Sequence, residues 1–141
     1  MYSLYMTAVH FDTVSDARAH LTQLLDAAEA GQPASLRRGS RRTAIVDSER
    51  LRATLAALRP SNAALFAEAG GWVVTLPNTP IAADASTVEA ALAEMIQALR
   101  EYAEDWADHL MHAPNHREHW GLVQLIQLSD DEQLHAWLVG E

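Results

Sequence analysis

Residues 11–55, "FDTVSDARAHLTQLLDAAEAGQPASLRRGSRRTAIVDSERLRATL", contain the signals that decide the N-terminal fold. Thr13 and Asp16 form a helix-capping pattern, in which a side-chain oxygen accepts a hydrogen bond from the first turn. Gly31 stands where helices commonly end, and Pro33 prevents the helix from resuming. The pattern therefore predicts a helix over 13–28. Its apolar residues have the three- and four-residue spacing of one helix face: Ala17, Leu21, Leu24, Leu25 and Ala28.

Extended segments flank this helix on both sides. "TAVHF" (7–11) precedes it, and "ASLRR" (34–38) and "TAIVD" (43–47) follow it as two short strands. Gly39-Ser40 separates the two later strands, as expected for a hairpin turn. A second helix is predicted over 48–58, so the N-terminal order is β-α-β-β-α.

Positive charge is concentrated at the predicted hairpin. The chain has ten basic residues, all of them arginine, and Arg37, Arg38, Arg41 and Arg42 fall within six positions. A glycine-centred turn would hold these guanidinium groups at an exposed tip. Arginine can bind two phosphate oxygens at once, or the edge of guanine. DNA contact is one interpretation of the cluster; protection of an edge strand from aggregation is the other.

The second half of the chain reads as mainly helical. Residues 60–71 resemble a connector, and "WVVTL" (72–76) is a plausible strand. A long amphipathic helix is predicted from a capping pattern at Ser86 and Glu89 to Leu110. Two shorter helices are predicted over 116–127, where a strand remains possible, and over 130–138. The second of these has Ser129 and Glu132 as its capping pattern.

These elements predict an α+β protein with three parts. They are an N-terminal domain (1–59), a connector (60–71) and a mainly helical C-terminal domain (72–141). Residues 1–59 carry eight arginines and six acids, whereas residues 60–141 carry two arginines and thirteen acids. This asymmetry is typical of halves that face different partners, one polyanionic and one basic.

Composition excludes several classes of protein. The chain has no cysteine, which rules out disulfides and thiolate metal sites. No apolar run approaches the ~20 residues that span a bilayer, and "MYSLYMTAVHF" lacks the pattern of a signal peptide. We therefore expect a cytoplasmic protein without membrane contact. No phosphate-binding loop, dinucleotide fingerprint or nucleophile elbow is present, so we expect neither catalysis nor a cofactor.

A run of histidines suggests a metal site but does not establish one. His109, His112, His116 and His119 are three, four and three residues apart, a spacing compatible with Zn²⁺ ligation. Pro114 lies between the two pairs and prevents them from sharing one helix face. A capped helix junction is the preferred interpretation, and a metal-dependent hydrolase is kept as an alternative.

Acids and aromatic residues in the same half have two interpretations each. Four acids in the second half of the long predicted helix could bind a basic partner protein or form the solvated face of that helix. The four tryptophans could form a platform for stacking nucleobases or lie in the core, and the core is expected because each falls on an apolar stripe. The acids are Glu101, Glu104, Asp105 and Asp108, and the tryptophans are Trp72, Trp106, Trp120 and Trp137.

Residues 7–58 resemble the Phd/YefM antitoxins of type II toxin–antitoxin systems. The similarity rests on an ordered set of motifs rather than on any one of them. The motifs are Ser15-Asp16-Ala17-Arg18 with Leu21, Gly31, Arg37 and Arg38 with Gly39, Ala44-Ile45-Val46, and Ser48-Glu49.

The resemblance implies a homodimer that binds operator DNA, represses its own operon and neutralises a co-encoded toxin. It makes residues 1–59 the dimerisation and DNA-binding domain and residues 72–141 the toxin-binding or accessory domain. In that family the arginine at the helix start and an arginine near the hairpin contact DNA. Here these positions are Arg18 and Arg38, or Arg37 if the hairpin register is shifted. Together with the composition, this predicts a DNA-binding set of Arg18, Arg37, Arg38, Arg41 and Arg42.

The C-terminal half departs from the short toxin-binding tail of better-known family members. Residues 113–138 resemble the C-terminal part of longer, mainly actinobacterial antitoxin-like proteins. Residues 72–102 are similar to the strand-then-helix pattern of HicB-type antitoxins. The overall resemblance to antitoxins implies that the toxin partner is an RNase of the RelE or PIN type. The alternative is an interaction module that binds a toxin or another partner without binding DNA.

Overall fold

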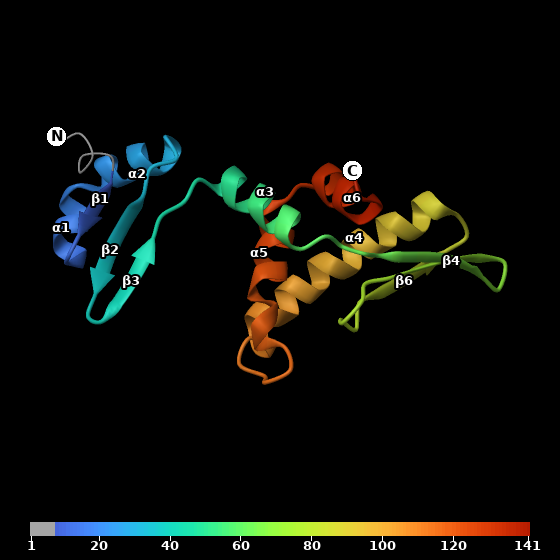
Figure 1. Ribbon diagram of the computed structural model, residues 1–141. Coiled ribbons are helices and arrows are strands. Elements are labelled where there is room, and N and C mark those ends of the chain that lie inside the picture. The colour runs from blue at the N-terminus through green and yellow to red at the C-terminus, as the bar shows by residue number, and fades with distance from the viewer. Residues whose placement is uncertain (1–7) are drawn as a thin grey trace. The chain divides into compact units, whose positions relative to one another are not determined.

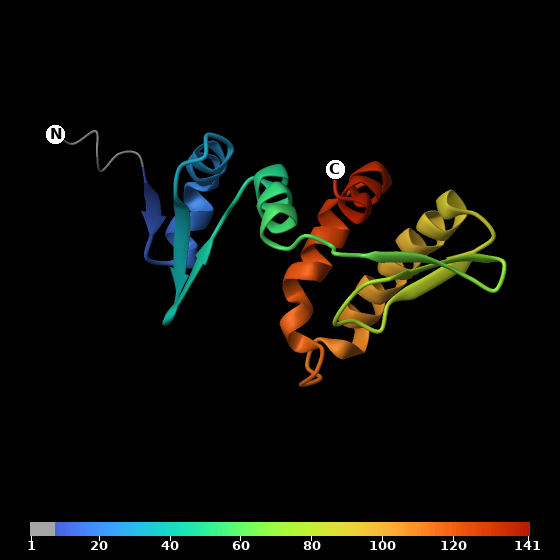
Figure 2. The ribbon, with the colours of Figure 1, turned by 45° about the vertical axis from the view of Figure 1, so that its right-hand side comes forward.

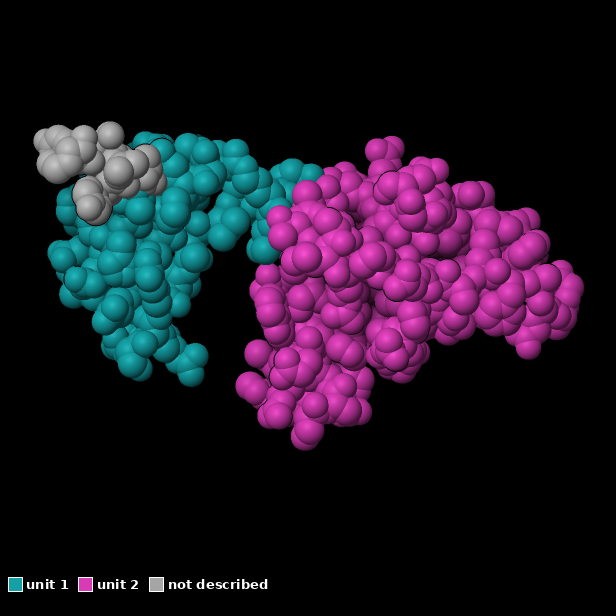
Figure 3. Space-filling model, in the orientation of Figure 1, with its two compact units in different colours: residues 1–51 teal, residues 52–141 magenta. Residues whose placement is uncertain are grey.

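The computed structural model describes residues 8–141 (Figure 1, Figure 2). Two compact units are present, residues 1–51 and residues 52–141 (Figure 3). We call them the N-terminal unit and the C-terminal unit. The division falls within helix α3 (Ser48–Leu58), whereas the sequence predicted a boundary at 59. Thr7 of the first predicted strand lies outside the described residues.

A three-stranded sheet and two helices build the N-terminal unit. The strands are β1 (Val9–Phe11), β2 (Ala34–Arg38) and β3 (Arg41–Ala44), in the order β1-β2-β3. β1 and β2 are parallel, and β2 and β3 form an antiparallel hairpin. Helices α1 (Val14–Ala19) and α2 (Leu21–Glu29) join β1 to β2.

The helix predicted over 13–28 is interrupted at His20. Thr13 caps α1 as expected, because its hydroxyl accepts a hydrogen bond from the Asp16 amide at 3.0 Å. His20 leaves the helical conformation with φ −123° and ψ 31°. Its Nδ1 lies 2.9 Å from the Asp16 carbonyl, and its ring stacks on Phe11 of β1 at 4.9 Å. The break thus depends on a contact with a strand, which periodicity along the helix does not reveal.

Small side chains allow the helices of this unit to lie close to the sheet. Leu24 is fully buried and is surrounded mostly by alanines. The face of the sheet that they cover carries Val9, Phe11 and Leu36. The remaining core residues are Ala17, Ala27, Ala28 and Ala34.

The first turn of α3 is tied to the end of α2. The Arg50 guanidinium donates hydrogen bonds to the Ala28 carbonyl at 3.1 Å and the Glu29 carbonyl at 2.7 Å. These carbonyls belong to the last turn of α2, where no following turn supplies the usual amide donors; the Ala28 carbonyl also accepts from the Gly31 amide at 3.1 Å. Gly31 follows with φ +81°, as expected for a glycine that ends a helix.

The C-terminal unit has more helical than strand residues, and its helices accompany an antiparallel sheet that includes the strand predicted over 72–76. The strands are β4 (Ala64–Glu68), β5 (Gly71–Thr75) and β6 (Ala82–Ala85), in the order β4-β5-β6. β4 lies inside the expected connector. Its alanine-rich sequence has a low strand propensity, and the strand forms because it pairs with β5 along its whole length.

Three helices complete this unit, and the α+β class is confirmed. α4 (Val88–Asp105) packs along one face of β5 and β6, as both ribbon views show. α5 (Trp120–Leu128) and α6 (Asp131–Val139) pack against α4. The fully buried side chains at their centre are Val74, Met95, Leu99, Leu122, Leu125, Ile126 and Leu134. None of the helices among residues 8–141 is long and apolar enough to cross a bilayer.

Two helix caps of this unit differ by one residue from their predictions. Thr87, not Ser86, caps α4 by accepting a hydrogen bond from the Ala90 amide at 3.1 Å. Asp130, not Ser129, caps α6 in a capping box with Gln133. The Ser129 hydroxyl instead donates to the Leu125 carbonyl at 2.6 Å, which satisfies it within the buried end of α5.

Candidate functional site

The hairpin holds its four arginines as two like-charged pairs. Gly39 has φ +62°, and it is the only residue of the two-residue turn with a positive φ, the pattern of a type II′ turn. The resulting register places Arg37 opposite Arg42 and Arg38 opposite Arg41. Like charges directly across two strands repel each other. Within residues 8–141, no carboxylate forms an ion pair with any of the four.

One pair lies on the sheet face that the helices leave open. Side chains alternate along a strand, so Arg37 and Arg42 share a face with Ser35 and His10. Arg42 donates to the buried Ser35 hydroxyl from Nε at 3.3 Å and from Nη2 at 3.2 Å. The same hydroxyl lies 2.8 Å from His10 Nδ1, and His10 Nε2 lies 3.0 Å from Asp12.

Two directions in this chain of hydrogen bonds follow from the groups themselves. The Arg42 N–H groups donate to Ser35, and the Asp12 carboxylate can only accept, so His10 Nε2 donates to it. The direction of the bond between Ser35 and His10 Nδ1 depends on whether Nδ1 carries a proton. The network holds the Arg42 guanidinium in place on the open face of the sheet.

Arg18 is exposed on α1, but its setting differs from the one that the sequence predicts. The predicted single helix would place Arg18 near its start, where free amides attract anions. In the structure Arg18 lies in the last turn of the six-residue helix α1. A cation there interacts favourably with the helix dipole. A contact between Arg18 and DNA would therefore depend on the exposure and charge of its side chain, not on free amides at a helix start.

The four acids of the C-terminal half lie at the far end of α4. Glu101, Glu104 and Asp105 are exposed on α4, and Asp108 is exposed on the π-helical turn η2 (Trp106–Leu110) that continues it. The predicted helix thus reaches Leu110, but with a change of winding after Asp105. Asp108 pairs with the neighbouring His109 at 3.2 Å. All four positions are accessible to a partner protein.

A tyrosine of α4 contacts two of the four histidines in the α4–α5 connection. The Tyr102 hydroxyl lies 2.9 Å from His116 Nδ1 and 2.6 Å from His119 Nδ1. A phenol has one proton, so it donates to one ring and accepts an N–H from the other. Trp106 adds a hydrogen bond from its indole N–H to the His116 carbonyl at 2.8 Å. The cluster fastens the connection to α4.

Burial shifts the proton affinities of this cluster. It lowers the pKa of His119 below its ordinary value of 6.5, and the nearby charges of Arg59 and His116 act in the same direction. Burial also raises the pKa of Tyr102, which Arg59 partly opposes. Within the described part of the chain, no three His, Asp or Glu side chains converge as metal ligands.

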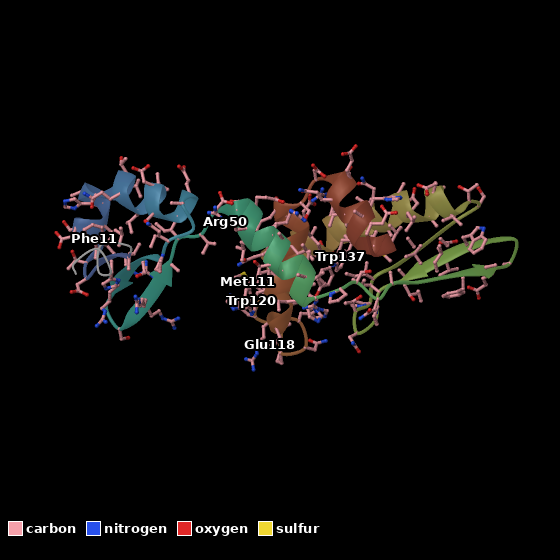
Figure 4. All side chains as sticks on the ribbon, turned by 45° about the horizontal axis from the view of Figure 1, so that its top comes forward. Phe11, Arg50, Met111, Glu118, Trp120 and Trp137 are labelled. Atoms are coloured by element: carbon pink, nitrogen blue, oxygen red, sulfur yellow. The ribbon has the colours of Figure 1, made fainter. Side chains whose placement is uncertain are left out.

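Trp120 is exposed, and the prediction that all four tryptophans lie in the core is wrong for this residue. Its side chain is 51% exposed at the start of α5. Trp137, by contrast, is buried and donates to the Arg59 carbonyl at 2.8 Å. Figure 4 labels Trp120 with two other exposed residues of this end of the unit, Met111 and Glu118. An exposed tryptophan beside acids is suited to protein recognition.

A family model described as "PHD_like: Antitoxin of toxin-antitoxin, RelE / RelB, TA system" matches residues 8–139. This chain belongs to that antitoxin family. The resemblance to antitoxins is therefore confirmed, over both units. No curated protein matches the chain.

The fold of this antitoxin is similar to one crystal structure, the antitoxin part of a putative toxin/antitoxin system from Syntrophomonas wolfei subsp. wolfei. The TM-score is 0.77 at 17% sequence identity, over 90% of this chain and 94% of that one. At this identity the similarity concerns the fold alone.

Sequence reasoning identified the arginines of the antitoxin but missed the residues that position or accompany them. Ser35 and His10 were not singled out, although period-two alternation puts Ser35 on the face of Arg37. The pairing of β1 with β2, which brings His10 to Ser35, is not visible in the sequence. The exposure of Trp120 also follows only from the position of α5.

The Tyr102 cluster predicts a loss of stability in mild acid. Because the pKa of His119 is lower in the folded protein than in the unfolded chain, unfolding takes up a proton. The free energy of unfolding should therefore fall as the pH drops below about 6.5, the pKa of His119 in the unfolded chain. The fall should end once the pH is below the pKa of His119 in the folded protein. Thermal unfolding between pH 8 and 5 measures this. His119→Asn should flatten the profile, whereas His112→Asn, at an exposed histidine, should not; equal profiles for the two variants would contradict the assignment.

Proposed function

We propose that this antitoxin has two activities carried by its two units. Its C-terminal unit binds a co-encoded toxin and neutralises it, and its N-terminal unit binds operator DNA as part of a homodimer and represses its own operon. The family match over residues 8–139 is the observation that carries the first activity. The second is supported by the arginine pairs of the hairpin. Neither activity requires catalysis by the antitoxin.

Electrostatic repulsion at the hairpin supports the binding of a polyanion. Two like-charged pairs without carboxylate partners weaken the hairpin in isolation, and a phosphate group bound between the guanidinium groups of a pair would relieve that repulsion. Arg42 is already oriented by Ser35, so less side-chain entropy is lost when it binds. The protection of an edge strand would need only the two arginines of β3, and β2 carries as many.

Exposed apolar side chains on the helices support a dimer. Val14, Leu21 and Leu25 of α1 and α2 are 37%, 49% and 43% exposed. A second copy packed against them would bury this surface and double the number of exposed arginines. A twofold axis would also match the symmetry of a palindromic operator.

The charge of the C-terminal unit supports a basic toxin, such as an RNase of the RelE or PIN type. Residues 52–141 carry thirteen acids and four arginines. Glu101, Glu104, Asp105 and Asp108 are all exposed at one end of α4, the end that Tyr102 joins to His119, beside Trp120. Acids of this kind steer a basic partner and set the rate of encounter, and the exposed tryptophan would supply an apolar anchor.

DNA binding should depend on the hairpin and on Arg18. Arg37→Ala is expected to lower affinity for the upstream intergenic DNA about tenfold or more, and to make the slope of log K against log salt shallower by about two, because each dimer loses two phosphate contacts. Arg18→Ala should also weaken binding. Gel shifts over a series of salt concentrations measure both quantities.

The matched control for this experiment is Arg117→Ala, which removes the same charge from an exposed position of the C-terminal unit. It should leave affinity and slope unchanged. If the parent protein does not bind the intergenic DNA, the alternative of an interaction module without DNA binding is correct. If it binds and Arg18→Ala and Arg37→Ala have no effect, the assigned surface is wrong.

Toxin binding should depend on Trp120. Trp120→Ala is expected to weaken binding to the purified product of the adjacent reading frame by about 2 kcal/mol or more, close to thirtyfold. Calorimetry of the two proteins gives the value. Val139→Ala removes an apolar side chain of similar exposure from the end of α6 and should change little. Equal losses in the two variants, or none in Trp120→Ala, would rule out the proposed anchor.

A further inference from the structure

β4 is an exposed edge strand in the C-terminal unit. It pairs with β5 on one side and, among the described residues, with no strand on the other. All five of its residues are exposed, and α4 packs on β5 and β6 instead. Leu65 and Phe66 are 41% and 43% exposed and lie outside the core.

The hairpin turn decides which backbone groups of β4 are free. Ala69 and Gly70 have φ values of +50° and +80°, the pattern of a two-residue type I′ turn. Such a turn makes Glu68 and Gly71 a hydrogen-bonded pair, and pairs alternate from there. Phe66 therefore bonds to β5, whereas the N–H and C=O groups of Leu65 and Ala67 point away from the sheet.

Nothing in the strand protects this edge. Proteins usually blunt an exposed edge with a lysine, a proline, a bulge or an inward-pointing charge. The strand "ALFAE" has one charge, Glu68 at its end, and its register against β5 is continuous. Elsewhere the unit is strongly acidic, so the absence of charge is confined to this strand. Its surface is complementary to an apolar strand rather than to a basic one.

We propose that β4 pairs with β4 of a second copy of this chain. The pairing is antiparallel, with Phe66 opposite Phe66 of the second copy and Leu65 opposite Ala67 of the second copy. In this register all five residues of each strand are paired, and the free backbone groups of Leu65 and Ala67 bond across the interface. The result is a continuous sheet of six strands with an aromatic pair at its centre.

Charge selects this register among those that the free backbone groups allow. Glu68 lies opposite Ala64 of the second copy, so the two Glu68 residues are offset by four positions, or about 14 Å along the strands. That separation exceeds the screening length of about 8 Å at physiological salt. A shift by two positions toward the turn would bring the two carboxylates to about half that distance. The inference depends on the C-terminal unit only and is independent of DNA or toxin binding.

Cysteine cross-linking tests the pairing, because the chain has no cysteine of its own. In the proposed register Phe66 lies opposite Phe66 of the second copy, at a non-hydrogen-bonded position of the antiparallel pair. Cα atoms at such positions lie about 4.5 Å apart, which is within the range of a disulfide. Full-length Phe66→Cys should therefore form a covalent dimer under mild oxidation, visible on a non-reducing gel. Glu68→Cys is the matched control on the same strand and face, and should remain largely without a cross-link because about 14 Å separates its two copies.

A second variant distinguishes pairing from chance collision. Ala67→Pro removes an N–H that points to the free edge and leaves the bonds to β5 intact, as proline permits on an edge strand. Added to Phe66→Cys, it should lower the cross-linking rate at least tenfold while circular dichroism stays unchanged. Folded Phe66→Cys that does not cross-link, or cross-links no faster than Glu68→Cys or the proline variant, overturns the proposal.

Discussion

The two-residue turn at Gly39 and Ser40 fixes the register of β2 against β3, and that register brings like charges together. Arg38 and Arg41 flank the turn as a hydrogen-bonded pair, so Arg37 and Arg42 form the next pair, in which side chains approach more closely. A hairpin selected for stability alone would place an acid opposite at least one of these arginines. An anion bound between the guanidinium groups of a pair would relieve this repulsion, and the proposed DNA contact rests on that effect.

Other residues of the N-terminal unit position this hairpin and the side chains that it carries. Leu24 and the alanines around it hold α1 and α2 against one face of the sheet, which leaves the other face open for Arg37 and Arg42. Ser35, buried within β2, orients Arg42 through its hydroxyl. The C-terminal unit carries an excess of acids, and four of them, Glu101, Glu104, Asp105 and Asp108, are exposed at the end of the unit where Trp120 is also exposed. One chain thus offers a cationic surface and an anionic surface, as two activities would require.

Local signals in the sequence predicted elements whose ends depend on neighbouring residues. Thr13 at the start of α1 and Gly31 after α2 stand where capping chemistry places them. The break at His20 was not predicted because the apolar stripe continues through it, and the ring contact that accompanies the break comes from Phe11 on a strand. β4 was missed for a related reason, since its alanines favour a strand only when β5 is beside them. The arginines could be found by counting, but the face that each occupies requires the sheet register.

The most direct test of the account replaces Arg37 by glutamate, with Arg37→Gln as the neutral reference. Amide hydrogen exchange in β2 and β3 reports local stability, and a gel shift reports affinity for operator DNA. An ion pair with Arg42 should raise the opening free energy of the hairpin in Arg37→Glu by about 0.2–1 kcal/mol above that of the reference, while DNA binding is lost. A hairpin that is weakened by the glutamate, together with unchanged DNA affinity, would contradict the claim that the arginines are held together for a polyanion.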